Sequence, residues 1–258
     1  MPVVEVAGGR IAYDAEGSGD AVVFVSGLGG MGAFWGGQIQ RFSSSSRVLT
    51  FDHRGVGRST GAPPYSVLQW SHDLLALLDH AGADRVHLVG HSTGGIVAQT
   101  FAVAHPDRVR SLALGGTWLK PDRRFRDQFA FRKEVLSQLG DDAYRMLSDL
   151  LAYPVADVTV PAAGKVPMTT QERRIILGRI DALLAYDGET IAPRVGAPTL
   201  VLSAGDDYIV PAHLSEAVAS AIPGARQVRF ENGGHFFPKT RADDYNAALA
   251  DFWAEAGR

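Results

Sequence analysis

A serine between glycines is the segment of this chain with the clearest chemical potential. Residues Gly90–Gly94 have the sequence Gly-His-Ser-Thr-Gly and follow the apolar run Arg85–Val89. Glycines on both sides of a serine, at a sharp turn from a buried strand into a helix, leave the serine hydroxyl exposed at the tip of the turn. The turn also directs backbone N–H groups and the positive end of the helix at one point, where an oxyanion could form. The pattern predicts that Ser92 is a nucleophile.

Two later segments offer the base and the acid that a serine nucleophile needs at neutral pH. His235 and the pair Asp206-Asp207 each follow an expected strand, so all three groups lie at carboxyl ends of strands in the order Ser, Asp, His. We expect His235 to take the Ser92 proton and to protonate the leaving group. We assign Asp207 as the orienting acid because it stands four residues before Pro211, and Asp206 stays the alternative.

The predicted oxyanion donors are two backbone N–H groups. One belongs to Thr93, next to the nucleophile, and the other to Leu28, in the loop after the expected strand Ala21–Val25. Loss of one such donor typically costs about 3–4 kcal/mol of transition-state stabilisation.

A competing interpretation is dinucleotide binding. Residues Gly27–Gly32 fit the pattern G-x-G-x-x-G, and Asp52 follows at roughly the spacing expected for a ribose ligand. Gly36 and Gly37, however, fall where the phosphate-binding helix should run, and each costs roughly 1 kcal/mol in a helix interior. We therefore expect no nucleotide cofactor.

Metal binding is a second competing interpretation. His87 and His91 are four residues apart, but they span a strand and a turn and cannot share a helix face. The chain has no H-E-x-x-H motif and no cysteine, so we expect no metal site.

Two arginines stand on apolar stripes of expected helices in the middle of the chain. Arg132 falls three residues after Phe129, and Arg179 has a similar place on a later helix. A buried guanidinium is costly unless it meets an anion, so both are predicted to reach a substrate anion, with Phe129 and Trp118 as apolar substrate contacts. The alternative is that each arginine extends to solvent or pairs with a nearby acid such as Asp181.

Strands and helices alternate along most of the chain, which predicts an α/β fold with a mostly parallel eight-stranded sheet covered by helices on both faces. The alternation breaks between about Trp118 and Tyr186, where helical segments replace it. We expect a helical cap over residues 118–190, inserted between core segments 1–117 and 191–258. The expected strands are Val3–Val6, Arg10–Asp14, Ala21–Val25, Val48–Phe51, Arg85–Val89, Val109–Leu114, Pro198–Leu202 and Gln227–Phe230.

Length and composition indicate an ordinary globular protein with one large domain. The 258 residues carry a net charge of −3 and no cysteine, which excludes disulfides and thiolate chemistry. The charge gives no reason to expect a nucleic acid or an anionic membrane as partner. We see no secretory signal and no membrane-length apolar run, so we expect a cytoplasmic protein with a small-molecule substrate, and a homodimer stays open.

With these residues in place, the chain resembles the α/β-hydrolase superfamily over nearly its full length. Within it the chain is similar to the aminoacrylate hydrolases of pyrimidine breakdown and the 3-oxoadipate enol-lactonases. One departure is Ser26-Gly27, where many members have His-Gly before the oxyanion residue. The segments that carry the narrower resemblance are Val25–Gly30, Phe34-Trp35 with Gln38, Leu151–Pro154, Arg179–Leu183 and Asp206–Pro211.

The resemblance implies a serine hydrolase that cleaves a small ester, lactone or amide-like bond through an acyl-enzyme on Ser92. It also implies that the anion met by the middle-segment arginines is a substrate carboxylate, and it implies no cofactor. Three alternatives stay open: hydrolysis of a C–C bond, cofactor-free perhydrolysis, and a ligand receptor on the same fold with poor turnover.

Overall fold

One mixed sheet forms the centre of the molecule, in a computed structural model that describes residues 2–157 and 167–256. Its strand order is β1-β2-β4-β3-β6-β7-β8-β9, and the two-residue strand β5 pairs with β2. Strands β3, β4 and β6 to β9 run parallel, whereas β1 and β2 join antiparallel. The predicted fold class is confirmed, with β5 as an addition. The strands are β1 (Val3–Val6), β2 (Gly9–Glu16), β3 (Ala21–Val25), β4 (Arg47–Phe51), β5 (Thr60–Gly61), β6 (Val86–His91), β7 (Val109–Gly115), β8 (Thr199–Ala204) and β9 (Arg226–Phe230).

Helices cover both faces of this sheet, and the alternation of side chains along each strand explains why. In β3, Val23 and Val25 pack into one core and Val22 and Phe24 into another. The first core includes residues of α2, α3 and α7, and the second includes residues of α1 and α9. These helices are α1 (Gly36–Phe42), α2 (Val67–His80), α3 (Thr93–Ala104), α7 (Ala212–Ala221) and α9 (Ala242–Ala256), with the short α8 (Phe237–Thr240) before the last.

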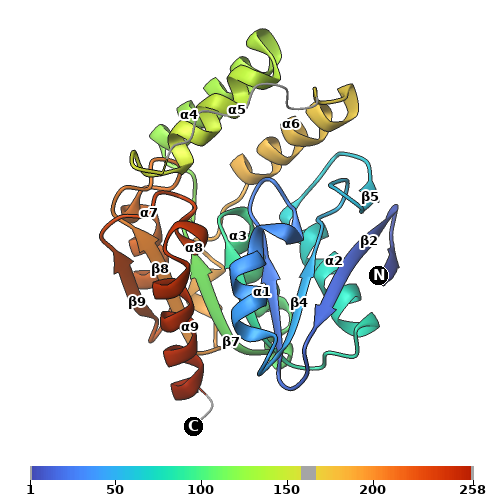
Figure 1. Cartoon of the computed structure of the whole chain (residues 1–258), viewed down its shortest axis with the longest axis vertical. Helices are drawn as coiled ribbons and strands as arrows, with labels where there is room; N and C mark the ends of the chain where they lie inside the picture. Colours follow the sequence, from blue (N-terminus) through green and yellow to red (C-terminus); the bar gives the residue numbers. More distant parts are fainter. Residues whose placement is uncertain (1, 158–166, 257–258) are drawn as a thin grey trace.

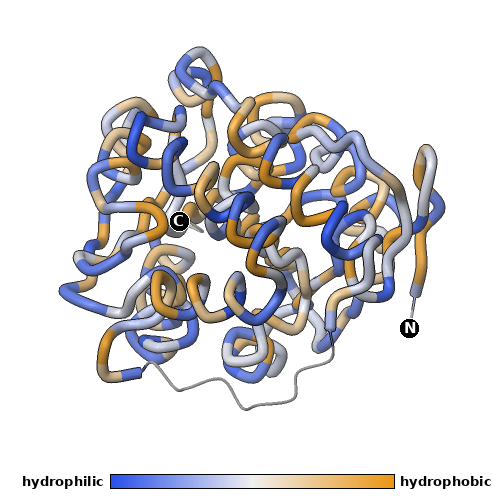
Figure 2. The backbone as a smooth tube through the Cα atoms, turned by 90° about the horizontal axis from the view of Figure 1, so that it is seen from above, coloured by the Kyte–Doolittle hydropathy of each residue, from blue (hydrophilic) through white to orange (hydrophobic). Residues whose placement is uncertain are grey.

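Three further helices lie above the carboxyl ends of the strands, between β7 and β8 in the chain (Figure 1). We call α4 (Arg123–Glu134), α5 (Asp141–Ala152) and α6 (Thr170–Leu184) the cap helices. The Asp122 side chain caps α4, and a capping box of Thr169 and Glu172 begins α6. Hydrophobic and hydrophilic residues alternate along the helices (Figure 2), as amphipathic helices over an apolar layer require. The division at residues 118 and 190 stays a prediction.

No helix within residues 2–157 and 167–256 combines the length and the apolar character that a membrane span needs.

Candidate active site

Ser92 occupies a strained turn between β6 and α3. Its φ of 56° and ψ of −122° make it the one non-glycine residue with positive φ in the described ranges. The flanking glycines are required by space, since a Cβ on Gly90 would lie 2.4 Å from the Gly94 carbonyl oxygen and one on Gly94 would lie 2.0 Å from that of Val25. The Ser92 N–H donates to the Gly115 carbonyl at 2.8 Å and fixes the turn to the neighbouring strand. The local geometry expected for a serine nucleophile is therefore present.

His235 and Asp207 form a buried pair at the ends of β9 and β8. The distance from His235 Nδ1 to Asp207 Oδ2 is 2.8 Å. Asp207 Oδ1 accepts the N–H groups of Ile209 and Val210 at 2.9 and 2.8 Å, which fixes the carboxylate. Asp206 points elsewhere and accepts the Gly234 N–H at 2.8 Å, so it stabilises the loop that carries His235.

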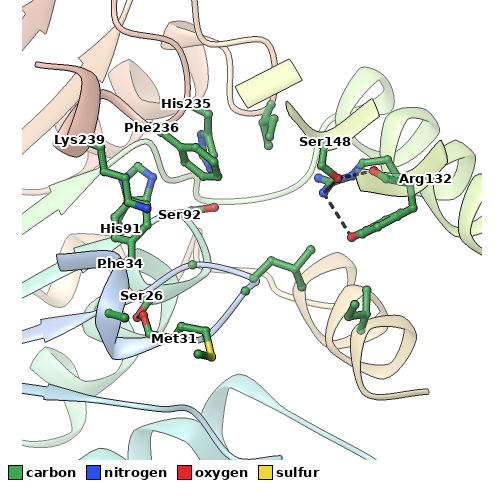
Figure 3. Close-up of a pocket in the computed structure, with 18 of the residues that line it drawn as sticks. Ser26, Met31, Phe34, His91, Ser92, Arg132, Ser148, His235, Phe236 and Lys239 are labelled. Carbon is green, nitrogen blue, oxygen red and sulfur yellow. Dashed lines mark hydrogen bonds between the residues drawn. The ribbon is translucent and has the colours of Figure 1, made fainter. Parts of the chain in front are cut away.

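Ser92 and His235 line the same cavity, and Figure 3 shows both side chains on its wall. Among the described residues, no hydrogen bond joins the Ser92 hydroxyl to the His235 ring. Such bonds are often long before substrate binds and shorten in the reactive complex, so the arrangement suits a base that approaches the hydroxyl with substrate present.

The ring of His91 packs against His235 and is neutral. The two ring centroids are 4.8 Å apart, and the Phe34 ring stacks on His91 with 5.3 Å between centroids. Burial, with the nearby His235 and Lys239 adding to it, holds the pKa of His91 well below its ordinary value. His91 is therefore a neutral packing surface for the candidate base at neutral pH.

The two predicted oxyanion donors flank Ser92. Leu28 lines the cavity, and Thr93 begins α3 directly after the serine. Gly27 lies so close that a Cβ there would be 3.0 Å from Ser92 Cβ and 3.4 Å from its Oγ. Within the described parts of the chain, neither the Leu28 nor the Thr93 N–H donates a hydrogen bond, so both stay available to a ligand.

The loop that carries Leu28 is closed by a serine rather than a histidine. The Ser26 hydroxyl donates to the Met31 carbonyl at 2.8 Å. Asp52, which the dinucleotide interpretation would place on a ribose, is buried and accepts the N–H groups of Gly32 and Arg58 at 2.9 and 3.0 Å. Ser26 and Asp52 therefore hold the backbone of the loops around Leu28 in place.

The cavity above Ser92 has a volume of about 530 Å³, which is the size of a small-molecule site. Its lining contains two cations, Arg132 and Lys239, and no aspartate or glutamate from the described chain. The Lys239 ammonium lies 4.7 Å from the centre of the Phe34 ring. The charge balance of the lining favours an anionic ligand.

Arg132 reaches this cavity from α4, across from Ser92 (Figure 3). It is 5% exposed, and no described carboxylate lies within ion-pair distance. Its Nη2 donates to the Ser148 hydroxyl at 3.1 Å and the Tyr144 hydroxyl at 3.3 Å, and its guanidinium carbon lies 4.8 Å from the Phe129 ring centre. Arg132 and Phe129 are thus brought to the cavity that Ser92 lines, whereas Asp181 pairs with Lys133 instead.

Arg179 and Trp118 do not line this cavity. Arg179 is fully buried on α6 and donates to the carbonyl oxygens of Leu28 and Gly27 at 2.9 and 3.2 Å. Its side chain therefore meets the back of the loop, not the substrate space. Trp118 is fully buried against Phe125, with 4.7 Å between ring centroids, and belongs to the apolar core.

Three side chains that complete the cavity were not predicted from the sequence: those of Tyr144, Ser148 and Lys239. Tyr144 and Ser148, four residues apart, share one face of α5, and a stripe of hydroxyls beside an expected buried arginine could have signalled them. Lys239 follows Phe236 by three residues. The helix α8 is too short for helical periodicity to predict that Lys239 faces the cavity. No group of three or more metal-binding side chains occurs in the described ranges.

The model of the family described as the alpha/beta hydrolase fold matches residues 20–242. The chain belongs to the alpha/beta hydrolase family. The expected superfamily resemblance is confirmed, and the protein is a hydrolase of this fold.

Relatives cover nearly the whole chain. A protein of Azorhizobium caulinodans named "Putative carbamate hydrolase RutD" is 32% identical over an alignment of 262 positions, which covers 99% of each chain. A protein of the same name from Pseudomonas savastanoi pv. phaseolicola is 34% identical and covers 90% of this chain and 92% of its own. The crystal structure of the enol-lactonase from Burkholderia xenovorans LB400 superposes with a TM-score of 0.86 at 25% identity, covering 98% of this chain and 100% of that one.

Proposed function

We propose that this protein is a serine hydrolase in which Ser92 is acylated, His235 is the general base and acid, and Asp207 orients His235. The observation that carries the proposal is the 2.8 Å contact between His235 Nδ1 and Asp207 Oδ2, at the wall of the cavity that Ser92 also lines. A histidine fixed in this way presents its other ring nitrogen to a serine, which is the arrangement that activates a hydroxyl.

The proposed reaction has two steps, acylation of Ser92 and hydrolysis of the acyl-enzyme. Ser92 Oγ bonds to the substrate carbonyl carbon while its proton passes to His235 Nε2, and the carbonyl oxygen becomes an anion at the Leu28 and Thr93 N–H groups. Return of the electron pair breaks the bond to the leaving group, which takes the proton from His235. Water then repeats the sequence on the acyl-enzyme, releases the acid and restores Ser92.

We further propose that the substrate is a small ester, lactone, carbamate or other amide-like compound with a free carboxylate. The cavity volume of about 530 Å³ suits a small molecule. Arg132 and Lys239 supply positive charge without a carboxylate from the lining to neutralise it. The names of relatives include a carbamate hydrolase and an enol-lactonase, which supports a bond of this class.

Steady-state turnover tests the function. We expect the wild type to hydrolyse p-nitrophenyl acetate over many turnovers and Ser92→Ala to lose at least about 10⁴-fold in kcat, because the nucleophile is gone. Ser220→Ala, at an exposed site on α7, is the matched control and should retain full activity. Retention of activity within about tenfold in Ser92→Ala would overturn the nucleophile assignment. A wild type that binds ligands but does not turn over would leave only a receptor.

A substrate panel then tests the bond and the charge. Matched esters, lactones and carbamates, each with and without a free carboxylate, should rank the carboxylate-bearing member of each pair higher in kcat/KM. Equal values within every pair would contradict the proposed substrate class.

A further inference from the structure

Arg179 is a buried cation without a counter-ion. It is 0% exposed on the cap helix α6, and within the described ranges no carboxylate lies within ion-pair distance. Its guanidinium carbon lies 4.7 Å from the centre of the Trp70 ring, and its Nη1 has no hydrogen-bond partner. Burial of an unpaired charge is costly, so the contacts that Arg179 does make require an explanation.

Those contacts are made to one loop, 151 residues away in the chain. Arg179 Nε donates to the Leu28 carbonyl at 2.9 Å, and Nη2 donates to the Gly27 carbonyl at 3.2 Å. The Gly27 carbonyl also accepts the Gly30 N–H at 3.0 Å. Burial lowers the pKa of Arg179 to about 10, so the guanidinium is charged at neutral pH and these hydrogen bonds are charge-assisted.

The carbonyl of Gly27 and the N–H of Leu28 belong to the same peptide unit. In a planar trans peptide the C=O and N–H point in opposite directions, so a donor that holds the carbonyl on one side fixes the N–H on the other. The Leu28 N–H donates to no described residue, and Gly27 lies against Ser92. The held N–H is thus the one assigned to the oxyanion.

We propose that Arg179 is a positioning residue of the oxyanion hole, which holds and polarises the Gly27–Leu28 peptide from the side opposite the substrate. The inference rests on the proposed serine mechanism. A cation that withdraws electron density from a carbonyl makes the N–H of the same amide a stronger donor, and a fixed donor needs no reorganisation when the oxyanion forms.

The place of Arg179 on α6 makes the cap a structural part of this hole. Gly178 packs so closely on the segment below that a Cβ there would lie 3.3 Å from a Tyr65 ring carbon and 3.4 Å from Pro63 Cβ. This close approach sets the height of α6 above the strand ends, where Figure 1 shows it. A shift of α6 would therefore carry the guanidinium away from the Gly27–Leu28 peptide.

The test measures, in Arg179→Met, whether kcat and the Ki of an oxyanion-forming inhibitor change while KM for the substrate does not. An aryl trifluoromethyl ketone bonds to Ser92 Oγ at its carbonyl carbon, and its oxygen becomes an oxyanion, so its Ki reports the hole directly. We expect kcat to fall roughly 10–100-fold, the Ki of the trifluoromethyl ketone to rise by a similar factor, and KM for a neutral ester to stay within about threefold. A folded variant with unchanged kcat and Ki, or with a raised KM alone, would overturn the proposal.

Two further variants complete the design. Arg174→Met, the same substitution at an exposed site of α6, should match the wild type. Arg179→Lys keeps the charge but loses the planar fork, so it should lose kcat and trifluoromethyl ketone affinity together, by roughly 3–10-fold. If Arg179→Met does not fold by circular dichroism, Arg179→Lys decides, and unchanged kcat and Ki there would overturn the proposal.

The failure of this inference is distinguishable from that of the proposed function. If the wild type forms no trifluoromethyl ketone adduct that Ser92→Ala abolishes, the serine mechanism fails and the role of Arg179 with it. If the adduct forms and the folded Arg179 variants bind the ketone as tightly as the wild type, only the role of Arg179 fails.

Discussion

The two sides of the cavity are held by different kinds of contact. On the sheet side, Asp207 and Ser92 are fixed by backbone groups, through hydrogen bonds of 2.8 and 2.9 Å. On the cap side, Arg132 is held by two side-chain hydroxyls at 3.1 and 3.3 Å and by aromatic faces. Backbone bonds from strand ends leave little freedom, whereas contacts between long side chains on helices adapt. In the proposed mechanism, the reacting groups are therefore fixed by the backbone, whereas the proposed recognition of the substrate depends on side chains with more conformational freedom.

The largest effect should separate the two adjacent aspartates on the sheet side. We expect Asp207→Asn to lower kcat for p-nitrophenyl acetate by about 10⁴-fold, because the His235 ring loses the acceptor that sets its tautomer. Asp206→Asn should cost less than about tenfold, since within the described residues its side chain accepts a hydrogen bond only from the Gly234 N–H. Similar losses in the two variants would show that the pair works as one electrostatic patch and not through one oriented bond.

The next effect concerns the sheet itself and its response to acid. His87 on β6 is 6% exposed and lies 2.7 Å from the Ser111 hydroxyl, and burial, with Arg110 adding to it, lowers its pKa to about 4. The unfolded chain binds this proton more readily, so the neutral folded ring contributes stability above pH 6.5 that is lost as the pH falls toward 4. The loss amounts to about 3 kcal/mol.

Urea unfolding at pH 7 and pH 4.5 tests this prediction. The wild type should lose about 2 kcal/mol more than His87→Gln between the two pH values, because glutamine cannot take up the proton. Identical losses would show that His87 takes no part in acid unfolding.

An effect of similar size is expected on the cap side, and it should depend on the substrate. We expect Arg132→Met to lower kcat/KM for a carboxylate-bearing ester by about 30–100-fold, mainly through KM, because a charge-assisted hydrogen bond contributes about 2–3 kcal/mol. The matched neutral ester should change by less than about threefold. Equal losses on both esters would mean that Arg132 supports the cavity wall and does not recognise charge.

The same contrast explains what could be predicted from the sequence. Ser92, Asp207 and His235 follow strands, and a parallel sheet brings the carboxyl ends of its strands to one edge. The order of the motifs was therefore enough to predict that the three residues lie at the same edge. Helical periodicity gave only the buried face on which Arg132 and Arg179 lie.

What each arginine meets depends on contacts that the local pattern does not contain. The carbonyls of Gly27 and Leu28 lie more than 150 residues from Arg179 in the chain, and main-chain acceptors leave no mark on residue type. The hydroxyls of Tyr144 and Ser148 reach Arg132 only because α5 packs beside α4. The hydrogen-bond partners of Arg132 and Arg179 could therefore not be predicted from the sequence.

Pre-steady-state acylation tests directly whether Ser92 is the nucleophile. When the enzyme is mixed with p-nitrophenyl acetate, we expect a burst of p-nitrophenol equal to one per active site. Acid quenching should then leave one acetyl group on the peptide that contains Ser92, as identified by mass spectrometry. Turnover without a burst and without acetyl on that peptide, or acetyl on another residue, would contradict the assignment of Ser92 as the nucleophile.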